Sequence, residues 1–298
     1  MSQVLPHSEL AAPVDLSALP GYRWYDNGQS ALGGSLLEAY RRIDTMLVRW
    51  AAECQAEDFF FPTFISAREL GKLDYFRSFP HLLTFPASLE PAQNNLNRFT
   101  ESNPLDAEGC VHVTALEPIR DVLTPAACYH FYISLQGQAL SSPRYLTTRA
   151  SCFRRETHYR PLERQWNFSM REIVCIGTAP EVKGFLSRYR EKADAFFKRV
   201  ALPIEWKKAT DPFFNPSRNP KYLAQRLDPV KTEMVFRTGL AIGSVNFHRN
   251  YFGEAFQIRR DGEDAFSGCV AFGIERWIFA FLNQYGPDQS VWPDFDTL

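Results

Sequence analysis

The stretch CFRRETHYRPLERQWNFSMREIVCIG, residues 152–177, has the pattern of two β-strands joined by a polar loop. Apolar and polar residues alternate through residues 152–156 and again through residues 166–176, which is the period of a half-exposed strand. The residues between them, 158–163, are mostly polar. The pattern predicts an antiparallel hairpin.

One face of this hairpin gathers charged groups and an aromatic ring. Because successive side chains of a strand point to opposite faces, Arg154 shares a face with Glu156, and Phe168 shares a face with Glu172. Arg164, just before the second strand, has the same parity. Such a surface indicates a polyanion site with a stacking platform. The alternative is a surface hairpin whose charges pair with one another.

The composition is that of a globular domain. With 298 residues, 45% hydrophobic and 22% charged, the chain has the length of one catalytic domain with insertions. A formal net charge of −1 argues against a long nucleic-acid footprint, which needs a basic surplus. The six dispersed cysteines, the lack of a signal-like N-terminus and the lack of a long apolar run predict a reduced, cytoplasmic protein without a membrane span.

The chain is read as one domain preceded by an arm. Residues 1–34 are expected to form a loose arm, and residues 35–298 a catalytic domain with an insertion at about residues 211–229, which are rich in Pro and Asn. Helical periodicity begins at Ser35 and at Thr178. Further strands are expected at residues 59–66 (interrupted by Pro62), at 110–113 and at 127–135, and residues 231–286 read as three strands and a helix.

The hairpin residues carry a family resemblance. The order Phe153-Arg154-x-Glu156, then Arg164-x-x-x-Phe168-x-x-x-Glu172, resembles the second signature motif of class II aminoacyl-tRNA synthetases, the hairpin that holds ATP. CVAFGIERWIFAFL, residues 269–282, is similar to their third motif. The likeness is narrower still to methanogen-type seryl-tRNA synthetases and their truncated relatives, the amino acid:[carrier protein] ligases, over roughly residues 36–298.

The resemblance implies an α+β fold, in which an antiparallel β-sheet is flanked by helices. It also implies a homodimer, because the helix from Ser35 and the strand with Pro62 resemble the first motif, which builds the dimer interface of the class. The alternative for this segment is a core helix followed by an edge strand that tolerates proline.

For ATP, the resemblance implies a role for each of five residues. Arg154 would contact the α-phosphate and the amino acid carboxylate, and Arg164 and Arg276 the outer phosphates. Phe168 would stack on adenine, and Glu156 would read its edge. Arginines suit this task because they stabilise developing negative charge without changing protonation state.

For metal and amino acid, the resemblance implies one zinc ion per chain, held by Cys128, Glu172 and Cys269, with the fourth position open to the substrate amino group. His130 is the substitute ligand if one cysteine fails, with a plain core or surface histidine as its alternative. The alternative for the two cysteines is a pair of buried core thiols. Matching substrate-contacting positions are Glu233, Ser244 and Asn246. The alternative for Ser244, Asn246 and His248 is a hydrogen-bonded strand end. The usual acidic magnesium ligand is replaced by the apolar run at 240–242.

The activity implied is ATP-dependent activation of a small amino acid, glycine or alanine, and its transfer to the phosphopantetheine thiol of an acyl carrier protein. No tRNA partner is expected, because residues 1–34 are too few to supply a tRNA-binding domain. The rival readings are a synthetase that still aminoacylates tRNA or another RNA, and a catalytically inactive regulatory protein.

The predicted insertion offers a surface for the carrier protein. Arg218, Lys221, Tyr222 and Arg226 lie close together, and the last three share a face if Pro220 begins a helix. A basic and aromatic face suits the acidic helix that carrier proteins present. The alternative is a solvated loop without a partner.

Overall fold

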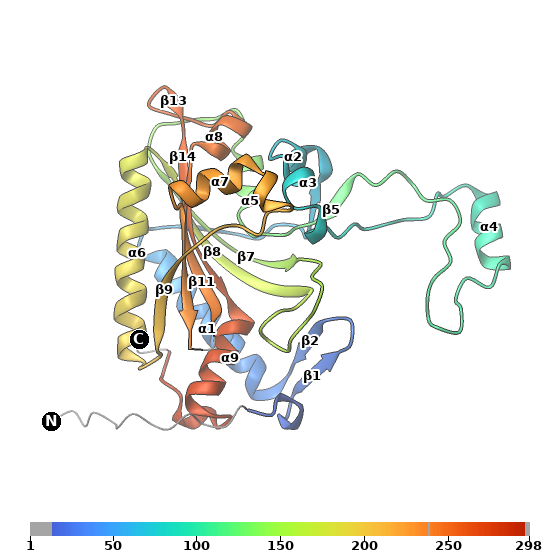
Figure 1. Ribbon diagram of the computed structural model, residues 1–298, viewed down its shortest axis with the longest axis horizontal. Coiled ribbons are helices and arrows are strands. Elements are labelled where there is room, and N and C mark those ends of the chain that lie inside the picture. The colour runs from blue at the N-terminus through green and yellow to red at the C-terminus, as the bar shows by residue number, and fades with distance from the viewer. Residues whose placement is uncertain (1–13, 238, 296–298) are drawn as a thin grey trace.

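The computed structural model describes residues 14–237 and 239–295. Its centre is a seven-stranded sheet in which every neighbouring pair is antiparallel except β3 and β7 (Figure 1). The strands lie in the order β3 (Glu57–Phe59), β7 (Arg144–Phe153), β8 (Asn167–Gly177), β14 (Phe266–Gly273), β11 (Leu240–Arg249), β10 (Lys231–Phe236) and β9 (Ile204–Ala209). The expected mostly antiparallel sheet flanked by helices is confirmed.

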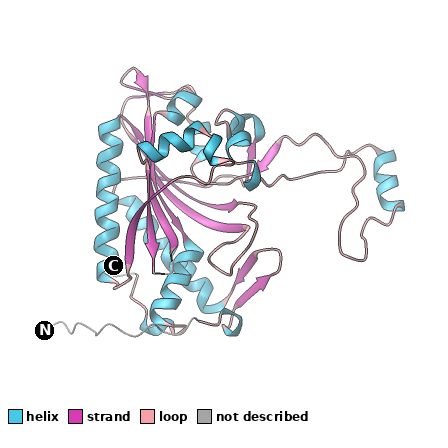
Figure 2. Ribbon diagram, in the orientation of Figure 1, coloured by secondary structure: helices cyan, strands magenta, loops and turns pink. Residues whose placement is uncertain are grey.

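Three long helices cover one face of this sheet: α1 (Gly34–Ala52), α6 (Ala179–Arg199) and α9 (Ile274–Tyr285). Alternate residues of the central strands, among them Ile173, Val270 and Phe272, point into the core beneath these helices. The ring of Trp50 on α1 meets the rings of Phe272 and Trp277 edge to face. Aromatic rings therefore fill the contact between the helices and the sheet, which are cyan and magenta in Figure 2.

Short helices cover the opposite face. The intervening strand residues, such as Val174, Ile176 and Ala271, pack against a second core formed by these elements. The short helices on this face are α2 (Ala67–Gly71), α3 (Tyr75–Ser78), α5 (Tyr129–Ser134) and α8 (Tyr251–Phe256), and α7 (Pro220–Leu227) lies nearby. The remaining strands are short: β4 (Phe64–Ser66), β5 (Asp121–Leu123), β6 (Ala139–Leu140), β12 (Arg259–Arg260) and β13 (Glu263–Asp264). The thin layer leaves room for a cavity on this face.

The predicted hairpin is formed by β7 and β8. Cys152 pairs with Phe168 and Phe153 pairs with Asn167, which is the last pair of the ladder. Arg154 and Glu156 therefore lie just beyond the end of β7, in the connecting loop, and not on a strand.

The strand predicted at residues 127–135 is wrong. The segment contains α5, with Cys128 immediately before it. The buried residues of the segment are Ala127, Cys128, Phe131, Tyr132 and Leu135, together with His130, and the first five have the spacing of one helical face. The aromatic and β-branched composition favoured a strand, but the period of burial is helical.

Two other expectations are corrected. Residues 110–113 form no strand but an exposed part of a segment, residues 84–119, that projects from the body around α4 (Gln93–Glu101) (Figure 1). In the expected loose arm, residues 14–34, a hairpin of β1 (Tyr22–Tyr25) and β2 (Gln29–Leu32) forms instead. The backbone N–H of Trp166 donates to the carbonyl of Gly28 at 2.8 Å, which fastens this hairpin to the β7–β8 loop. Residues 1–13 lie outside the described residues.

Other features agree with the sequence. A helix begins at Pro220, and proline separates β3 from β4. Helix α1 begins one residue before Ser35, with Gly33 at its N-cap. All six cysteines are free thiols. Among the described helices, none combines the length and the apolar character that crossing a membrane requires.

Helix α6 begins with a capping box. The Thr178 hydroxyl accepts from the N–H of Glu181, and the Glu181 carboxylate accepts from the N–H of Thr178 at 2.7 Å. We expect Thr178→Ala to lower the free energy of unfolding by about 1 kcal/mol, because one backbone donor loses its acceptor. Chemical denaturation measures this. Thr178→Ser keeps the hydroxyl and is the control; equal losses in both variants would contradict the capping role.

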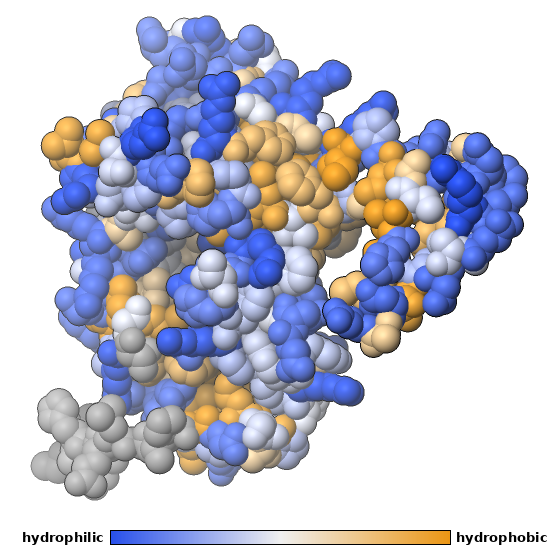
Figure 3. Space-filling view, turned by 45° about the vertical axis from the view of Figure 1, so that its right-hand side comes forward, coloured by the Kyte–Doolittle hydropathy of each residue, from blue (hydrophilic) through white to orange (hydrophobic). Residues whose placement is uncertain are grey.

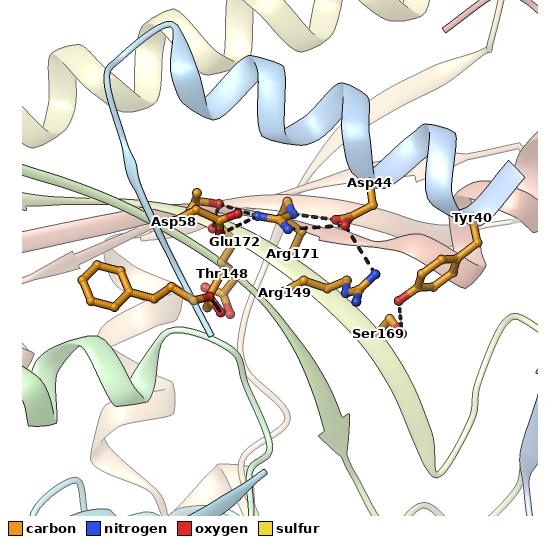
Figure 4. A network of polar contacts seen from close by, with 10 residues as sticks. Tyr40, Asp44, Asp58, Thr148, Arg149, Ser169, Arg171 and Glu172 are labelled. Carbon is orange, nitrogen blue, oxygen red and sulfur yellow. Dashed lines mark hydrogen bonds and ion pairs between the residues drawn. The ribbon is translucent and has the colours of Figure 1, made fainter. Parts of the chain in front are cut away.

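A buried ion cluster ties α1 to the sheet. The guanidinium of Arg171 on β8 lies 2.5 Å from Asp44 of α1 and 3.1 Å from Asp58 of β3 (Figure 4). Nearby, the hydroxyl of Tyr40 donates to Ser169 at 2.8 Å. Two carboxylates compensate the buried cation, which makes its burial tolerable. The next residue of β8, Glu172, points to the other face.

Candidate functional site

A cavity of about 440 Å³ opens on the face of the sheet opposite α1, α6 and α9. It is lined by residues from β8, β10, β11 and β14, by the β7–β8 loop and by one side of α7. All residues expected to contact ATP, metal or amino acid line it: Arg154, Glu156, Arg164, Phe168, Arg276, Cys128, Glu172, Cys269, Glu233, Ser244 and Asn246.

Three arginines meet at one end of the cavity. The side chain of Arg276, in the first turn of α9, donates to the carbonyls of Glu163 and Ala241, each at 2.7 Å. Burial and the neighbouring cations of Arg154 and Arg164 lower the pKa of Arg276 to about 10. An anion that enters between these guanidinium groups relieves their mutual repulsion. A cluster of three guanidinium groups of this kind could hold an anion.

The stacking surface lies beside these cations. The guanidinium of Arg154 is 5.3 Å from the ring centroid of Phe168, and its Nε donates to the carbonyl of Pro125 at 2.9 Å. Glu156 holds Arg164 through a 2.9 Å ion pair. Cation and ring are therefore adjacent, as the phosphates and base of a nucleotide require.

A residue that the sequence did not single out positions Arg276. The carboxylate of Glu275 accepts from the N–H of Ser169 with both oxygens, each at 2.9 Å, so the start of α9 is fastened to β8. Burial raises the pKa of Glu275 to about 6. The only sequence signal was its place directly before Arg276.

The same cavity holds a candidate metal centre. One thiol sulfur each from Cys128 and Cys269 and a carboxylate oxygen of Glu172 lie within 4.8 Å of one another, and all three residues are buried. The Glu172 oxygen also accepts from the N–H of Ala127 at 3.1 Å and of Cys128 at 3.3 Å. Among the described residues, this is the one group of three such ligands.

The donor set fits zinc. Two thiolates and a carboxylate are ordinary zinc ligands, and three protein ligands leave one tetrahedral position open. A hydrogen bond with Cys269 and burial raise the pKa of Cys128 well above its usual value. Binding of a metal cation therefore favours the thiolate form of the cysteine and releases the proton of the thiol.

His130 does not reach this centre, and its expected role as a substitute ligand is not supported. Its ring stacks on Phe61 with centroids 5.2 Å apart. The reason is the helix: in α5 the residues two apart lie on different faces, whereas in a strand they would share one. The histidine that approaches the centre is His248, whose Nε2 is 3.6 Å from the sulfur of Cys269.

The expected substrate residues line the same cavity on the neighbouring strands β10 and β11. The amide Nδ2 of Asn246 lies 3.0 Å from Ser244 Oγ and 3.2 Å from Cys269 Sγ. Glu233 is paired with Lys231 at 3.3 Å, and Lys231 also reaches Asp211 at 3.3 Å. Lys231 and Asp211 were missed, because isolated charges in different segments have no spacing that marks them.

One cavity wall comes from a segment to which the sequence gave no chemistry. Tyr75, Ser78, Phe79 and Leu82 line the cavity, and Tyr129 lies opposite Tyr75 with ring centroids 6.0 Å apart. Short helices of irregular sequence carry no periodicity from which this wall could have been read.

Of the four expected docking residues, Tyr222 and Arg226 lie together on α7, with the guanidinium of Arg226 6.0 Å from the ring centroid of Tyr222. Lys221 lines the cavity and pairs with Asp74 at 3.2 Å, whereas Arg218 and Arg226 are exposed. Tyr222 is half-buried, with its ring edge-on to Phe213.

Comparison with known proteins agrees with this geometry. Residues 120–285 match the tRNA synthetase class II core domain (G, H, P, S and T). The chain is 34% identical to amino acid–[acyl-carrier-protein] ligase 1 of Bradyrhizobium diazoefficiens, over 97% of this chain and 92% of that protein. It is 30% identical to a type-2 serine–tRNA ligase of Methanopyrus kandleri, over 60% of this chain and 38% of that protein.

The fold is also found in a solved structure. M. kandleri SerRS in complex with A. aeolicus tRNASec superimposes with a TM-score of 0.80 at 18% identity, over 98% of this chain and 61% of the larger one. With the sheet, the matched core domain and the near full-length relative in agreement, the chain belongs to the amino acid–[acyl-carrier-protein] ligase family, which is built on the class II aminoacyl-tRNA synthetase core.

Proposed function

We propose that this protein uses ATP to activate a small amino acid and transfers it to the phosphopantetheine thiol of an acyl carrier protein. The relative in B. diazoefficiens carries the ligase name. The observation that carries the proposal is that a single cavity holds both a cluster of three arginines and a buried Cys-Glu-Cys group. These two groups suit the two substrates of an adenylation reaction, ATP and an amino acid.

In the first step, the amino acid carboxylate attacks the α-phosphorus of ATP and pyrophosphate leaves. Arg154 would stabilise the charge on the α-phosphate, while Arg164 and Arg276 hold the outer phosphates and Phe168 stacks on adenine. Zinc, when bound by Cys128, Glu172 and Cys269, would offer its open position to the substrate amino group.

In the second step, the phosphopantetheine sulfur attacks the carbonyl carbon of the mixed anhydride and AMP leaves. The carrier brings its own thiol and the anhydride is already activated, so no cysteine of this chain need act as a nucleophile.

The choice of glycine or alanine is supported by the size of the site. The ring of Tyr129 follows Cys128 directly, and Met170 shares the strand face of Glu172, so bulky groups line the cavity next to the ligands. Magnesium would enter with ATP. We also propose a homodimer through α1 and the β3–β4 segment, the elements that resemble the dimer motif of the class.

Pyrophosphate exchange with a panel of amino acids, followed by mass spectrometry of a holo-carrier protein, tests the function. We expect exchange that depends on glycine or alanine and a mass increase of one residue on the phosphopantetheine arm. Charging of tRNA with no carrier product would favour the synthetase alternative. Absence of exchange with every amino acid would favour the regulatory one.

Helix α7 is the proposed carrier surface. Next to exposed Arg218 and Arg226 it presents Leu223, 48% exposed, and Leu227, 88% exposed. A basic rim around an apolar patch at the mouth of the cavity suits an acidic helix with an apolar face.

We expect the double charge reversal Arg218→Glu with Arg226→Glu to slow transfer to the carrier roughly tenfold and to reduce its salt dependence, because steering charges are lost. Pyrophosphate exchange should stay unchanged. Lys207→Glu with Lys208→Glu on β9 is the matched control. Unchanged transfer in the α7 variant would place the docking surface elsewhere. Lys221 is left intact in this test, because its pair with Asp74 makes it part of the cavity wall.

A further inference from the structure

We infer that His248 is a positioning residue for the metal centre: its Nε2–H donates to the sulfur of Cys269 and holds that sulfur in the ligating direction. The inference rests on the proposed zinc site. It concerns a group that is not itself one of the three ligands.

A strand irregularity aims His248 at the centre. Along β11 and β14, Phe247 pairs with Gly268 and Arg249 pairs with Ser267, so His248 is the extra residue of a β-bulge. Arg249, which follows it, has a φ of 53°, in the left-handed region that non-glycine residues rarely adopt. A bulge of this kind redirects a side chain out of the regular alternation. Strained backbone at this point is a feature that packing alone does not require.

The hydrogen bonds of the ring fix which nitrogen faces the sulfur. Nδ1 lies 3.1 Å from the hydroxyl of Tyr132 and 3.2 Å from the hydroxyl of Ser267, while Nε2 lies 3.6 Å from Cys269 Sγ. Phe252 closes over the ring edge to face, with centroids 5.0 Å apart. The imidazole is therefore clamped between two hydroxyl groups and one sulfur.

The state of the sulfur selects the tautomer. A neutral imidazole has one donor and one acceptor nitrogen. When Cys269 is a thiolate, a bare Nε2 lone pair would repel it, so Nε2 carries the hydrogen. Nδ1 is then the acceptor, and either hydroxyl can donate to it. In that arrangement both ring nitrogens of His248 have a partner.

The sulfur of Cys269 thus faces two side-chain N–H groups, from His248 and from Asn246 at 3.2 Å. Such donors fix the direction of a ligand and reduce the negative charge that it passes to the metal. Losing a group of this type typically weakens metal binding by about 10- to 100-fold. Asn246 lies where substrate contacts are expected, so His248 is the better residue to test.

The test compares His248→Leu with His248→Gln in the full-length protein. Zinc affinity is measured by competition with a chromophoric chelator, and the sulfur-to-metal charge-transfer band is recorded after replacement by cobalt(II). We expect His248→Leu to weaken zinc binding by about 10- to 100-fold and to shift the band. His248→Gln should recover most of the affinity, because its amide N–H extends to the region of Nε2.

His130→Leu is the matched control, since it removes a second buried histidine, on α5, whose ring stacks on Phe61 and not on the ligands. It should bind zinc as the wild type does. If His248→Leu bound zinc with wild-type affinity and its cobalt(II) charge-transfer band did not shift, the inference would be overturned. The proposal of a metal site would not be affected. Equal losses in the Leu and Gln variants would overturn it too, because packing and not the hydrogen bond would then be the cause. If the wild-type protein bound no zinc, the proposed metal site itself would be wrong. The ligase activity is tested separately, by pyrophosphate exchange.

Discussion

Replacing Arg276 by alanine is expected to slow adenylate formation by a factor on the order of 10² to 10³, or about 3–4 kcal/mol. The guanidinium is oriented by the carbonyls of Glu163 and Ala241 before any ligand arrives, so its charge needs no rearrangement in the transition state. Arg154→Ala should have an effect of the same size, since it lies beside the stacking ring of Phe168. Amino-acid-dependent pyrophosphate exchange measures both.

The control for this experiment is Arg259→Ala, which removes an exposed arginine on β12 that pairs with Asp264. Its exchange rate should match the wild type. Circular dichroism must show that the two active-site variants remain folded, because Arg276 also satisfies two buried carbonyls. Near-normal exchange in folded Arg276→Ala would refute the assignment of the ATP site.

Cys128→Ala or Cys269→Ala should abolish stoichiometric zinc binding and, with it, amino acid binding. Each change removes one of three ligands and leaves a carboxylate and one thiol, a set too small to hold the ion. ATP binding should survive, because none of the three arginines belongs to the ligand group. Elemental analysis and separate titrations with ATP and amino acid check these results.

Cys54→Ala is the matched control, because this thiol lies on the helix-covered side of the sheet. Its zinc content should equal that of the wild type. An N-acetylated amino acid should fail as a substrate of the wild type, since it has no free amine to offer the metal. Full activity in a zinc-free preparation would contradict the metal assignment.

The sequence predicted the hairpin and its charged residues because strand alternation and a repeated spacing are local properties. It also predicted the start of α7 from Pro220. The conformation around Cys128 could not be read correctly, because aromatic and β-branched residues favour a strand while their burial follows a helical period. The metal ligands come from three separate segments, and only the family resemblance joined them.

Other features depend on tertiary structure and leave no local mark. The bulge at His248 is a mismatch between two strands, so neither strand alone reveals it. The projecting segment around α4 likewise had no signal of its own. Its exposed apolar residues, including Val111, 58% exposed, and Leu105, 56% exposed, give it an apolar surface away from the body (Figure 3).

Because Arg171 and Glu172 are adjacent on β8, the pairing of this strand decides how both the ion cluster and the candidate metal site are assembled. The two residues point to opposite faces of β8, one into the ion cluster with α1 and the other to the metal ligands. A shift of one residue in the pairing register of β8 would exchange the faces of Arg171 and Glu172. It would bury a cation beside the two thiols and a carboxylate beside Asp44. Because β8 is bonded on both sides, by β7 and β14, no partly shifted pairing can keep one cluster and lose the other. The candidate metal site therefore forms only when β8 has its native pairing, and a chain in which β8 is shifted should lack both the ion cluster and the ligand group.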